Sequence, residues 1–245
     1  MDASGSQDAN KAYYDAFSTR YETHRGTNDP GGYHELLDEL ESGFVMRFGR
    51  NKDVLEVGCG TGLVLQRIRG FASSAVGIDL SPGMLQLARS RGLEVTEGSA
   101  LSLPFPDASF DVTCSFKVLA HIPEIEVALA EMARVTRPGG YVLAEFYNPW
   151  SFRGLLKRFG PARATSDRAH EGQVFLRFDS PARARELAPP GCHLETARGV
   201  RIVTPSAYLM RVPGLRSILR GLELRLCDSP ARDFAGFWIA AYKKA

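Results

Sequence analysis

A glycine-rich turn and the acid that follows it are the residues whose types and spacing best fit a chemical task. The turn occupies residues 58–62, directly after an apolar run at 53–57, and Asp79 ends a second apolar run at 75–79. Glycine lets a backbone turn tightly against a ligand, and a carboxylate in such a place can accept hydrogen bonds from ribose hydroxyls. The pattern therefore predicts a nucleotide-binding site.

The spacing of the glycines distinguishes two kinds of nucleotide. Dinucleotide sites carry G-x-G-x-x-G, whereas this turn is G-x-G-x-G, with Leu63 in the place of the third glycine. Glu56 stands just before the turn, where a carboxylate would repel a pyrophosphate but would suit an ammonium group. S-adenosylmethionine (SAM) carries an ammonium and a sulfonium and no phosphate. The local chemistry therefore favours SAM over NAD.

Four motifs in order along the chain resemble those of the class I SAM-dependent methyltransferases, in the small-molecule branch (type 11) that includes the ubiquinone and menaquinone biosynthesis enzymes. The resemblance covers residues 10–147 well and the remainder loosely. It implies a Rossmann-like α/β fold, with a seven-stranded, mostly parallel sheet, helices on both faces and an antiparallel last strand. The motifs are residues 54–62, 77–84, 103–111 and 137–140.

The resemblance also implies how the cofactor is held. The backbone at Gly58 and Gly60 would lie against the methionine part of SAM, while Glu56 would reach its amino group. Asp79 would bind both ribose hydroxyls. The expected cofactor-binding residues are Tyr14, Tyr21, Glu56, Gly58, Cys59, Gly60, Asp79, Leu80, Met84, Ser99, Ala100 and Phe116, with S-adenosylhomocysteine as the product.

The expected adenine site departs from the family at one position. Leu80 and Met84 would enclose the adenine, although both are also suited to ordinary core packing. Where the family often has Asp-Ala to bind the adenine amino group, this chain has Ser99 and Ala100. A hydroxyl is a neutral and shorter acceptor than a carboxylate, so a modestly weaker cofactor affinity is expected.

The run at residues 12–21 resembles the lid helix of the family. Tyr14, Phe17 and Tyr21 are spaced three and four apart, so they share one face of a helix. The aromatic face could contact SAM or pack on the core, and a lid could do both.

After the fourth expected strand, His121 precedes an apolar residue, as is common in the family. Imidazole titrates near neutrality, so His121 is the candidate catalytic base, with a structural role as the alternative. Lys117 is interpreted as a surface charge rather than as a clamp for the substrate. Tyr33 and Tyr147 are possible hydrogen-bond donors in the pocket. No metal-ligand spacing is found, so no metal is expected.

Apolar runs that alternate with helical patterns predict a parallel sheet with helices on both faces. Ser-Pro pairs at 81–82 and 180–181 predict helix starts, with serine as the N-cap, and residues 137–140 are expected to close a helix. Strands are expected at 53–57, 75–79, 93–97, 110–115, 140–147, 193–203 and 234–242.

Length and composition favour one sizeable domain. The 245 residues carry a net charge of +2, which gives no reason to expect a nucleic-acid partner. The four cysteines have no C-x-x-C spacing, and no signal-peptide run is found, so a cytoplasmic protein is expected, as a monomer or homodimer. Residues 1–10 are expected to form a disordered tail and 11–245 the methyltransferase domain.

The charge gathers in the part that resembles the family least. Between residues 148 and 230 there are 14 Lys and Arg against 7 Asp and Glu. An acceptor-side insertion is expected at about 148–178 and a helical cover at about 205–228. Both mix aromatic, leucine and arginine residues. They could form the pocket for a lipophilic or anionic acceptor, lie on a membrane surface, or simply cover the core with solvated arginines.

The sequence thus predicts a SAM-dependent methyltransferase that transfers a methyl group to a small, lipophilic or aromatic metabolite. The turn after the fourth strand lacks the Asn/Asp-Pro-Pro-aromatic motif of enzymes that methylate base or amide nitrogens. Two alternatives stay open: a nicotinamide-dependent Rossmann oxidoreductase, and a module that binds SAM without transferring its methyl group.

Overall fold

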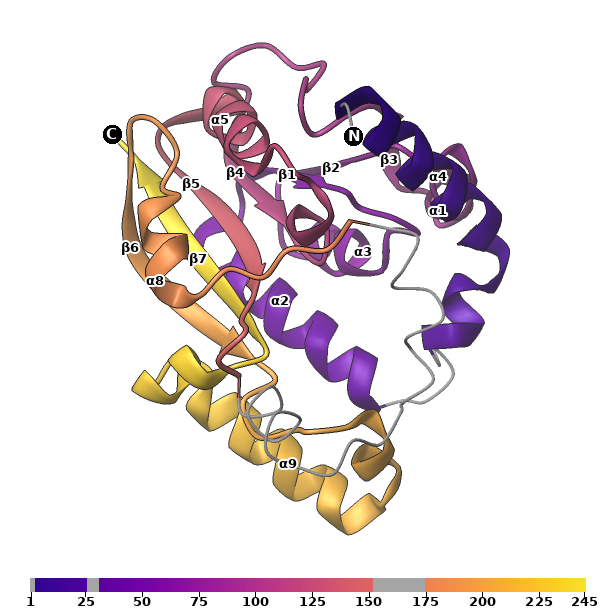
Figure 1. Cartoon of the computed structure of the whole chain (residues 1–245), viewed down its shortest axis with the longest axis vertical. Helices are drawn as coiled ribbons and strands as arrows, with labels where there is room; N and C mark the ends of the chain where they lie inside the picture. The colour runs from indigo at the N-terminus through magenta and orange to yellow at the C-terminus, as the bar shows by residue number, and fades with distance from the viewer. Residues whose placement is uncertain (1–2, 26–30, 152–174) are drawn as a thin grey trace.

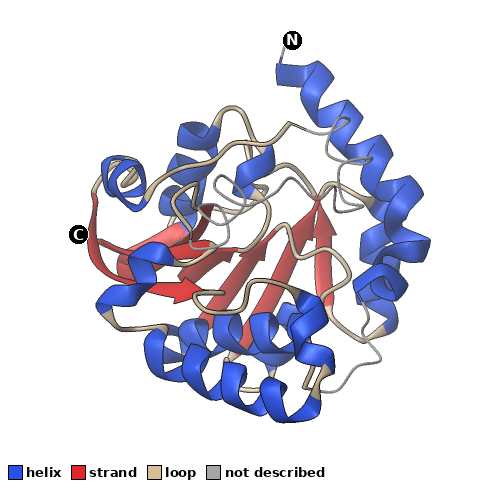
Figure 2. Cartoon of the chain, turned by 60° about the horizontal axis from the view of Figure 1, so that its bottom comes forward, coloured by secondary structure: helices blue, strands red, loops and turns tan. Residues whose placement is uncertain are grey.

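The chain forms a seven-stranded sheet enclosed by helices (Figures 1 and 2). The structure is a computed structural model that describes residues 3–25, 31–151 and 175–245. The strand order is β3-β2-β1-β4-β5-β7-β6. The strands are β1 (Asp53–Val57), β2 (Ser74–Asp79), β3 (Glu94–Glu97), β4 (Phe110–Ser115), β5 (Thr136–Tyr147), β6 (Cys192–Val200) and β7 (Phe237–Lys244).

Strand directions place the ligand-binding edge. The pairs β1·β2, β1·β4, β2·β3 and β4·β5 are parallel, while β7 runs antiparallel to both β5 and β6. This confirms the expected Rossmann-like sheet with an antiparallel last strand. Because only β7 is reversed, its beginning lies at the same edge as the carboxyl ends of the other strands.

The sheet is buried on both faces, because alternate residues of each strand point to opposite sides. Val54 packs into the layer that contains α2, α3 and α9, and Leu55 packs into the layer that contains α5 and α8. The helices are α1 (Ala3–Arg25), α2 (Tyr33–Gly49), α3 (Leu63–Arg69), α4 (Pro82–Ser90), α5 (Ile125–Val135), α8 (Pro181–Glu186) and α9 (Pro213–Leu226), with the 3-10 turns η1 (Leu119–His121), η2 (Ala207–Arg211) and η3 (Pro230–Phe234).

Serine caps begin two helices as predicted. The Ser81 side chain accepts a hydrogen bond from the backbone of Met84 at the start of α4, and Ser180 does the same for Arg183 at the start of α8. Each cap satisfies a backbone N–H that the first helical turn leaves without a partner. The cap at Ser81 also fixes the direction in which the chain leaves β2.

Other boundaries differ from the expectations. Helix α1 begins at Ala3, so the structure has no tail of ten residues before the first helix. Strand β5 begins at Thr136, because Thr136 pairs with Phe110 of β4 before a register shift. The residues expected to close a helix, 137–140, therefore lie inside β5, where Gly139 has a positive φ of 78°.

The two expected acceptor-side segments are described to different extents. Within the proposed insertion, residues 152–174 lie outside the described residues. The range of the proposed helical cover contains η2 and α9. The ranges that the structure describes contain no helix with the length and apolar character needed to cross a membrane.

Candidate active site

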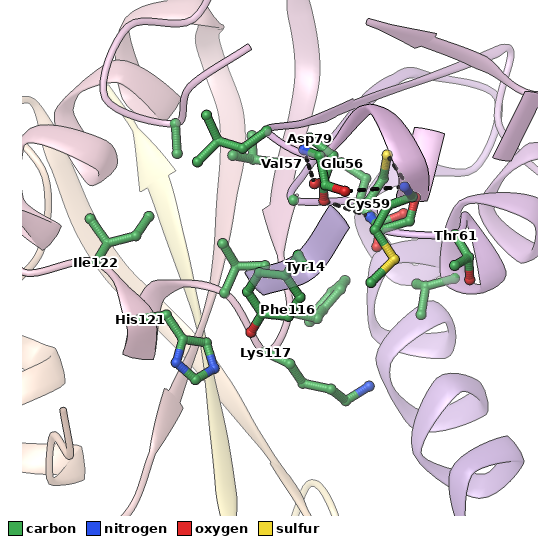
Figure 3. A pocket seen from close by; sticks show the side chains of 18 of the residues that line it. Tyr14, Glu56, Val57, Cys59, Thr61, Asp79, Phe116, Lys117, His121 and Ile122 are labelled. Carbon is green, nitrogen blue, oxygen red and sulfur yellow. Dashed lines mark hydrogen bonds between the residues drawn. The ribbon is translucent and has the colours of Figure 1, made fainter. Parts of the chain in front are cut away.

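A pocket of about 670 Å³ lies at the carboxyl edge of the sheet (Figure 3), and α1 contributes side chains to its lining. Its lining comes from the ends of β1, β2 and β5, the loops after β3, β4 and β6, and the first residue of β7. The structure brings together every site residue proposed from the sequence: Tyr14, Tyr21, Glu56, Gly58, Cys59, Gly60, Asp79, Leu80, Met84, Ser99, Ala100, Phe116 and His121 all line this pocket.

The glycine turn brings backbone directly to the pocket. Gly58 has φ +76°, and a Cβ there would lie 2.3 Å from the Val118 side chain, so a larger residue would not fit. Gly60 also has a positive φ, of 53°, yet a Cβ there would meet nothing within 4 Å. The backbone at Gly60 therefore faces open space, and a ligand can approach it closely.

The Asp79 carboxylate is held from two sides by backbone. The N–H of Gly60 donates to Oδ2 at 2.8 Å, and the N–H of Ser81 donates to Oδ1 at 2.9 Å. Burial raises the pKa of Asp79, and these N–H donors partly oppose that shift. Because a carboxylate offers about four lone-pair sites, Asp79 keeps acceptor capacity for a further donor.

Glu56 is in a different position. Its side chain is buried, with 3% exposed, and Oε2 meets no hydrogen-bond partner among the residues that the structure describes. Burial raises the pKa of Glu56 well above its ordinary value, and the neighbouring Glu41 raises it further, while Lys117 opposes the shift. A buried carboxyl oxygen without a partner in a pocket is suited to a cationic donor on a ligand.

The far end of the cofactor region is mostly apolar. Met84 and Phe116 are buried at 2% and 5% exposure and also contact the pocket, so Met84 serves the core and the pocket together. The Ser99 hydroxyl accepts a hydrogen bond from the Leu101 N–H at 3.1 Å. This bond holds the turn after β3 and uses part of the acceptor capacity of that hydroxyl. Burial raises the pKa of the Cys59 thiol, so it stays protonated.

Helix α1 is attached to the beginning of α4 through a residue that the sequence reasoning missed. Asp15 Oδ1 accepts hydrogen bonds from the Gly83 N–H at 3.0 Å and from the Ser81 hydroxyl. A Cβ at Gly83 would come within 2.7 Å of the Ser18 hydroxyl, so the glycine permits close contact between the helices. The signal was an acid on the expected lid helix together with Ser-Pro-Gly at a helix N-terminus, where the dipole favours an anion.

His121 lies at the other end of the pocket from the glycine turn (Figure 3). Its Nδ1 is 3.0 Å from the carbonyl oxygen of Phe175, and its ring lies 6.3 Å from that of Tyr14 and 6.1 Å from that of Tyr147. Burial lowers its pKa, which favours the neutral ring. Since a carbonyl can only accept, Nδ1 carries the proton in that form and Nε2 is the acceptor.

The interpretation of Lys117 as a surface charge is wrong. Its Nζ lies 2.7 Å from the carboxylate of Glu41 and 3.4 Å from that of Asp38, both on α2. Its backbone N–H donates to Glu145 at 3.0 Å, and its φ is +60°. This cation therefore compensates buried acids beneath the pocket, which is unlike the exposed position expected for a charged residue after a strand.

The acceptor end contains residues from distant parts of the chain. Tyr33 and Tyr147, proposed as possible donors, both line the pocket, and Arg201 and Phe237 line it as well. Sequence reasoning missed Arg201 and Phe237, because their placement depends on which strand edge β6 and β7 reach. Arg201 and Phe237 fell inside the strands expected at 193–203 and 234–242, whereas β6 ends at Val200 and β7 begins at Phe237.

Residues 55–144 match the family model described as a methyltransferase domain. Over these residues the chain is similar to a methyltransferase domain. Two curated relatives are similar over parts of their length. Demethylmenaquinone methyltransferase from Tropheryma whipplei (strain Twist) is 38% identical over 109 residues, which cover 41% of this chain and 44% of the relative. Malonyl-[acyl-carrier protein] O-methyltransferase from Serratia marcescens is 38% identical over 127 residues, which cover 51% and 48%.

The chain thus spans about half the length of these curated relatives. Among solved structures, a SAM-dependent methyltransferase from Thermotoga maritima aligns with a TM-score of 0.65 and 19% identity, over 95% of this chain and 98% of that one. This likeness extends the fold of the methyltransferase domain to nearly the whole chain.

The family and the fold imply SAM as the cofactor. The pocket residues fit that molecule. Glu56 offers an unsatisfied carboxyl oxygen for an ammonium group, Gly60 offers open backbone, and Asp79 keeps acceptor capacity for hydroxyls. The two anionic side chains would disfavour a pyrophosphate in the same place.

Proposed function

We propose that this protein is a SAM-dependent methyltransferase that acts on a small, lipophilic or aromatic metabolite. The observation that carries the proposal is the buried Glu56 Oε2, which lacks a partner in the described part of the chain and lies in one pocket with the open backbone of Gly60 and the held carboxylate of Asp79. An ammonium, a methionine backbone and a ribose are the groups that this combination suits.

When bound, SAM supplies a methyl group on a positively charged sulfur, which is already activated for transfer. The remaining tasks of the chain are positioning and the exclusion of water. Glu56 would hold the ammonium group of the cofactor and Asp79 its ribose hydroxyls, through charge-assisted hydrogen bonds. Helix α1, anchored by Asp15, places Tyr14 and Tyr21 along the pocket, where their rings displace water.

His121 is our candidate for the general base. The carbonyl of Phe175 fixes the proton on Nδ1, and the lowered pKa keeps the ring neutral near pH 7. Nε2 is then the ring nitrogen that can take a proton from an acceptor hydroxyl or amine as the methyl group is transferred. Transfer to an acceptor that has no proton to lose would not use this step.

The acceptor end supports a small molecule with apolar or aromatic character. Tyr147 packs against Phe237 with ring centroids 4.9 Å apart, and both rings line the pocket. The two curated relatives are named for a demethylmenaquinone and a malonyl-acyl-carrier-protein substrate, which are also acceptors other than nucleic acid. We propose no nucleic-acid substrate for this protein.

We further propose a cytoplasmic location, as a monomer or homodimer, with peripheral contact to membranes through η2 and α9. All four cysteines are free, which suits a reducing compartment. Tyr208, Val212 and Ile218 are 71%, 52% and 61% exposed and belong to the same part of the chain as the exposed Arg211 and Arg225. Flotation with anionic and neutral vesicles tests the membrane contact. If the protein floats with neither kind of vesicle, the contact is contradicted.

The activity is tested by incubating the protein with SAM labelled on its methyl group and with fractionated cell extract. Label in a small organic or aqueous metabolite is the expected result. Label on nucleic acid would contradict the small-molecule assignment. Binding of SAM without any transfer would instead support a binding module, and tight NADH binding without SAM binding would support an oxidoreductase.

A further inference from the structure

Arg201 is a pocket cation that has no acidic partner among the residues that the structure describes. Its Nη1 donates to the neutral hydroxyl of Tyr33 at 3.0 Å, and its guanidinium lies over the Phe237 ring, 4.8 Å from the centroid. Nε is buried and meets no hydrogen-bond acceptor among the described residues. Within that same part of the chain, Arg201 forms no ion pair with a carboxylate. Its backbone is strained, with a φ of +63°.

Other cations show what such a guanidinium usually binds in this protein. Arg177 holds Asp179 through Nε and Nη2 at 2.7 and 2.9 Å, and Arg198 holds Asp228 through the same two atoms at 2.9 and 2.6 Å. This edge matches the geometry of a carboxylate. In Arg201, the equivalent edge lies against Gly236 and has no carboxylate among the described residues, so a ligand anion would meet the guanidinium from its pocket side.

Glu145 is the acid that Arg201 influences through space, but it does not line the pocket and forms no ion pair with Arg201. Burial raises the pKa of Glu145, which favours its neutral form. Glu145 Oε1 accepts the Lys117 N–H and its Oε2 has no partner among the described residues, so Glu145 does not supply a hydrogen-bonded carboxylate for Arg201. A ligand that brings an anion would supply the missing partner.

The guanidinium is held at the end of an aromatic strip. We define this strip as Tyr147 and Phe237, which are directly paired across β5 and β7. His121 borders it at one end, 6.1 Å from the ring of Tyr147, and Arg201 borders it at the other. A Cβ at Gly236 would lie 2.5 Å from Arg201 Nε, so the absence of a side chain there leaves room for the guanidinium.

We propose that the acceptor is a planar aromatic acid, whose carboxylate binds Arg201 while its ring lies along the aromatic strip and its methylated group faces His121. This inference rests on the proposed function and names its substrate class. Arg201 then determines specificity, because an acceptor that lacks the anion would leave the guanidinium desolvated and without a partner.

Binding of model acids tests this. The wild type and the variants Arg201→Gln, Arg201→Lys and Gly236→Ala are each saturated with S-adenosylhomocysteine and titrated calorimetrically with 4-hydroxybenzoate, 4-hydroxyphenylacetate and 4-hydroxycinnamate, and with their amides. The wild type should bind at least one acid about tenfold or more tightly than its amide. Arg201→Gln should abolish this preference, and Arg201→Lys should retain part of it.

Gly236→Ala keeps the charge but displaces the guanidinium, so it should also lose the preference. Arg225→Gln, which removes an exposed cation of α9, is the matched control and should behave as the wild type. Equal binding of acids and amides by the wild type, binding of none of the acids, or an unchanged preference in Arg201→Gln would overturn the proposal. SAM affinity is measured on the same samples. If SAM binds normally, any of these outcomes overturns only the acceptor proposal, whereas loss of SAM binding would contradict the proposed function itself.

Discussion

Glu56 and Asp79 are both buried carboxyl groups at one edge of the sheet, yet their surroundings differ. Asp79 receives two backbone N–H donors, whereas Glu56 Oε2 receives none from the described residues. Asp79 is therefore arranged before a ligand arrives. Glu56 remains a costly buried acceptor until a cation reaches it, and its charge state is coupled to ligand binding.

This coupling predicts proton release when SAM binds. Burial raises the pKa of Glu56, so its neutral form persists above the ordinary value of 4.5. An ammonium favours the carboxylate and lowers that pKa, so the bound state holds fewer protons and SAM affinity should rise with pH through the raised pKa. Titration calorimetry in buffers of different ionisation enthalpy should show heats that depend on the buffer.

Glu56→Gln should remove this buffer dependence and weaken SAM binding roughly 10- to 100-fold, because one charge-assisted hydrogen bond is lost. Glu94→Gln, at an exposed position of β3, serves as the control. Buffer-independent heats for the wild-type protein would show that Glu56 is not the group that receives the ammonium.

The pH dependence of methyl transfer tests His121. Because burial lowers its pKa from 6.5, the base is neutral and competent at pH 7, and the rate should fall only as pH drops through that lowered value. His121→Gln should flatten this acid limb and lower the rate about 100-fold or more at saturating acceptor. An unchanged rate and an unchanged acid limb in the variant would remove His121 from the mechanism.

At the scale of elements, two helices bring distant segments to the pocket. Helix α1 reaches the cofactor end and is fixed to α4 by Asp15, while α9 supports the loop that carries Arg201. Neither helix gains its position from its own hydrogen bonds. A small number of polar side chains determine where each one lies, so their removal should affect ligand binding more than helix content.

Asp15→Ala should loosen α1 from the N-terminus of α4. Two hydrogen bonds and a favourable interaction with the helix dipole are lost, and we expect about 1–2 kcal/mol lower stability and severalfold weaker SAM binding. Thr19→Ala, at an exposed position of the same helix, is the control. Unfolding in urea and calorimetric SAM titration provide the two measurements, and wild-type SAM affinity in Asp15→Ala would contradict a lid role for α1.

Glu223 of α9 is fully buried, and its carboxylate accepts hydrogen bonds from the backbone N–H groups of Ile202, Val203 and Thr204, each at 2.9 Å. Glu223→Gln places an amide N–H₂ against one of these donors, so stability should fall by about 1–3 kcal/mol. Because Arg201 precedes this loop, binding of aromatic acids should weaken while SAM affinity persists.

Denaturant unfolding and calorimetry on the same samples test both effects of Glu223→Gln. Arg225→Gln, two positions further along α9, is again a suitable control. Loss of SAM binding in parallel with acid binding would indicate general unfolding rather than a displaced loop.

For the molecule as a whole, the acids beneath the pocket set a pH dependence of stability. Glu145 is 1% exposed, its Oε1 accepts the Lys117 N–H, and its Oε2 meets no partner in the described ranges. Its folded-state pKa is raised, so the native protein binds the proton more tightly than the unfolded chain. This contribution is present in full below the unfolded pKa of about 4.3 and is lost as pH rises through the raised value.

Glu145→Gln keeps the acceptor for Lys117 and removes the titrating group. The variant should be as stable as the wild type near pH 5 and more stable at pH 8, as measured by urea unfolding at both values. Glu94→Gln is the control, and its change in stability between pH 5 and pH 8 should equal that of the wild type. If Glu145→Gln is less stable than the wild type by a larger margin at pH 8 than at pH 5, Glu145 is not the group that sets this pH dependence.

Much of the cofactor end could be predicted because its residues are neighbours in the sequence. Glu56, Gly58 and Gly60 lie on one strand and the turn that follows it, and strand and turn geometry places them almost regardless of the rest of the fold. Lys117 could not be assigned in the same way, because whether a lysine after a strand is exposed depends on which helix packs over it. Here that helix is α2, which brings Glu41 and Asp38.

The sequence by itself determined the parallel sheet covered by helices, through local periodicity, and the resemblance of its motifs to the methyltransferases selected residues that line one pocket. Tertiary structure decided the acceptor end. Phe237 begins β7 and Arg201 follows the end of β6, and the order β5-β7-β6 brings both residues to the edge where Tyr147 ends β5. Such long-range pairings leave little trace in local sequence, because they are selected by the burial of whole strands rather than by any short motif.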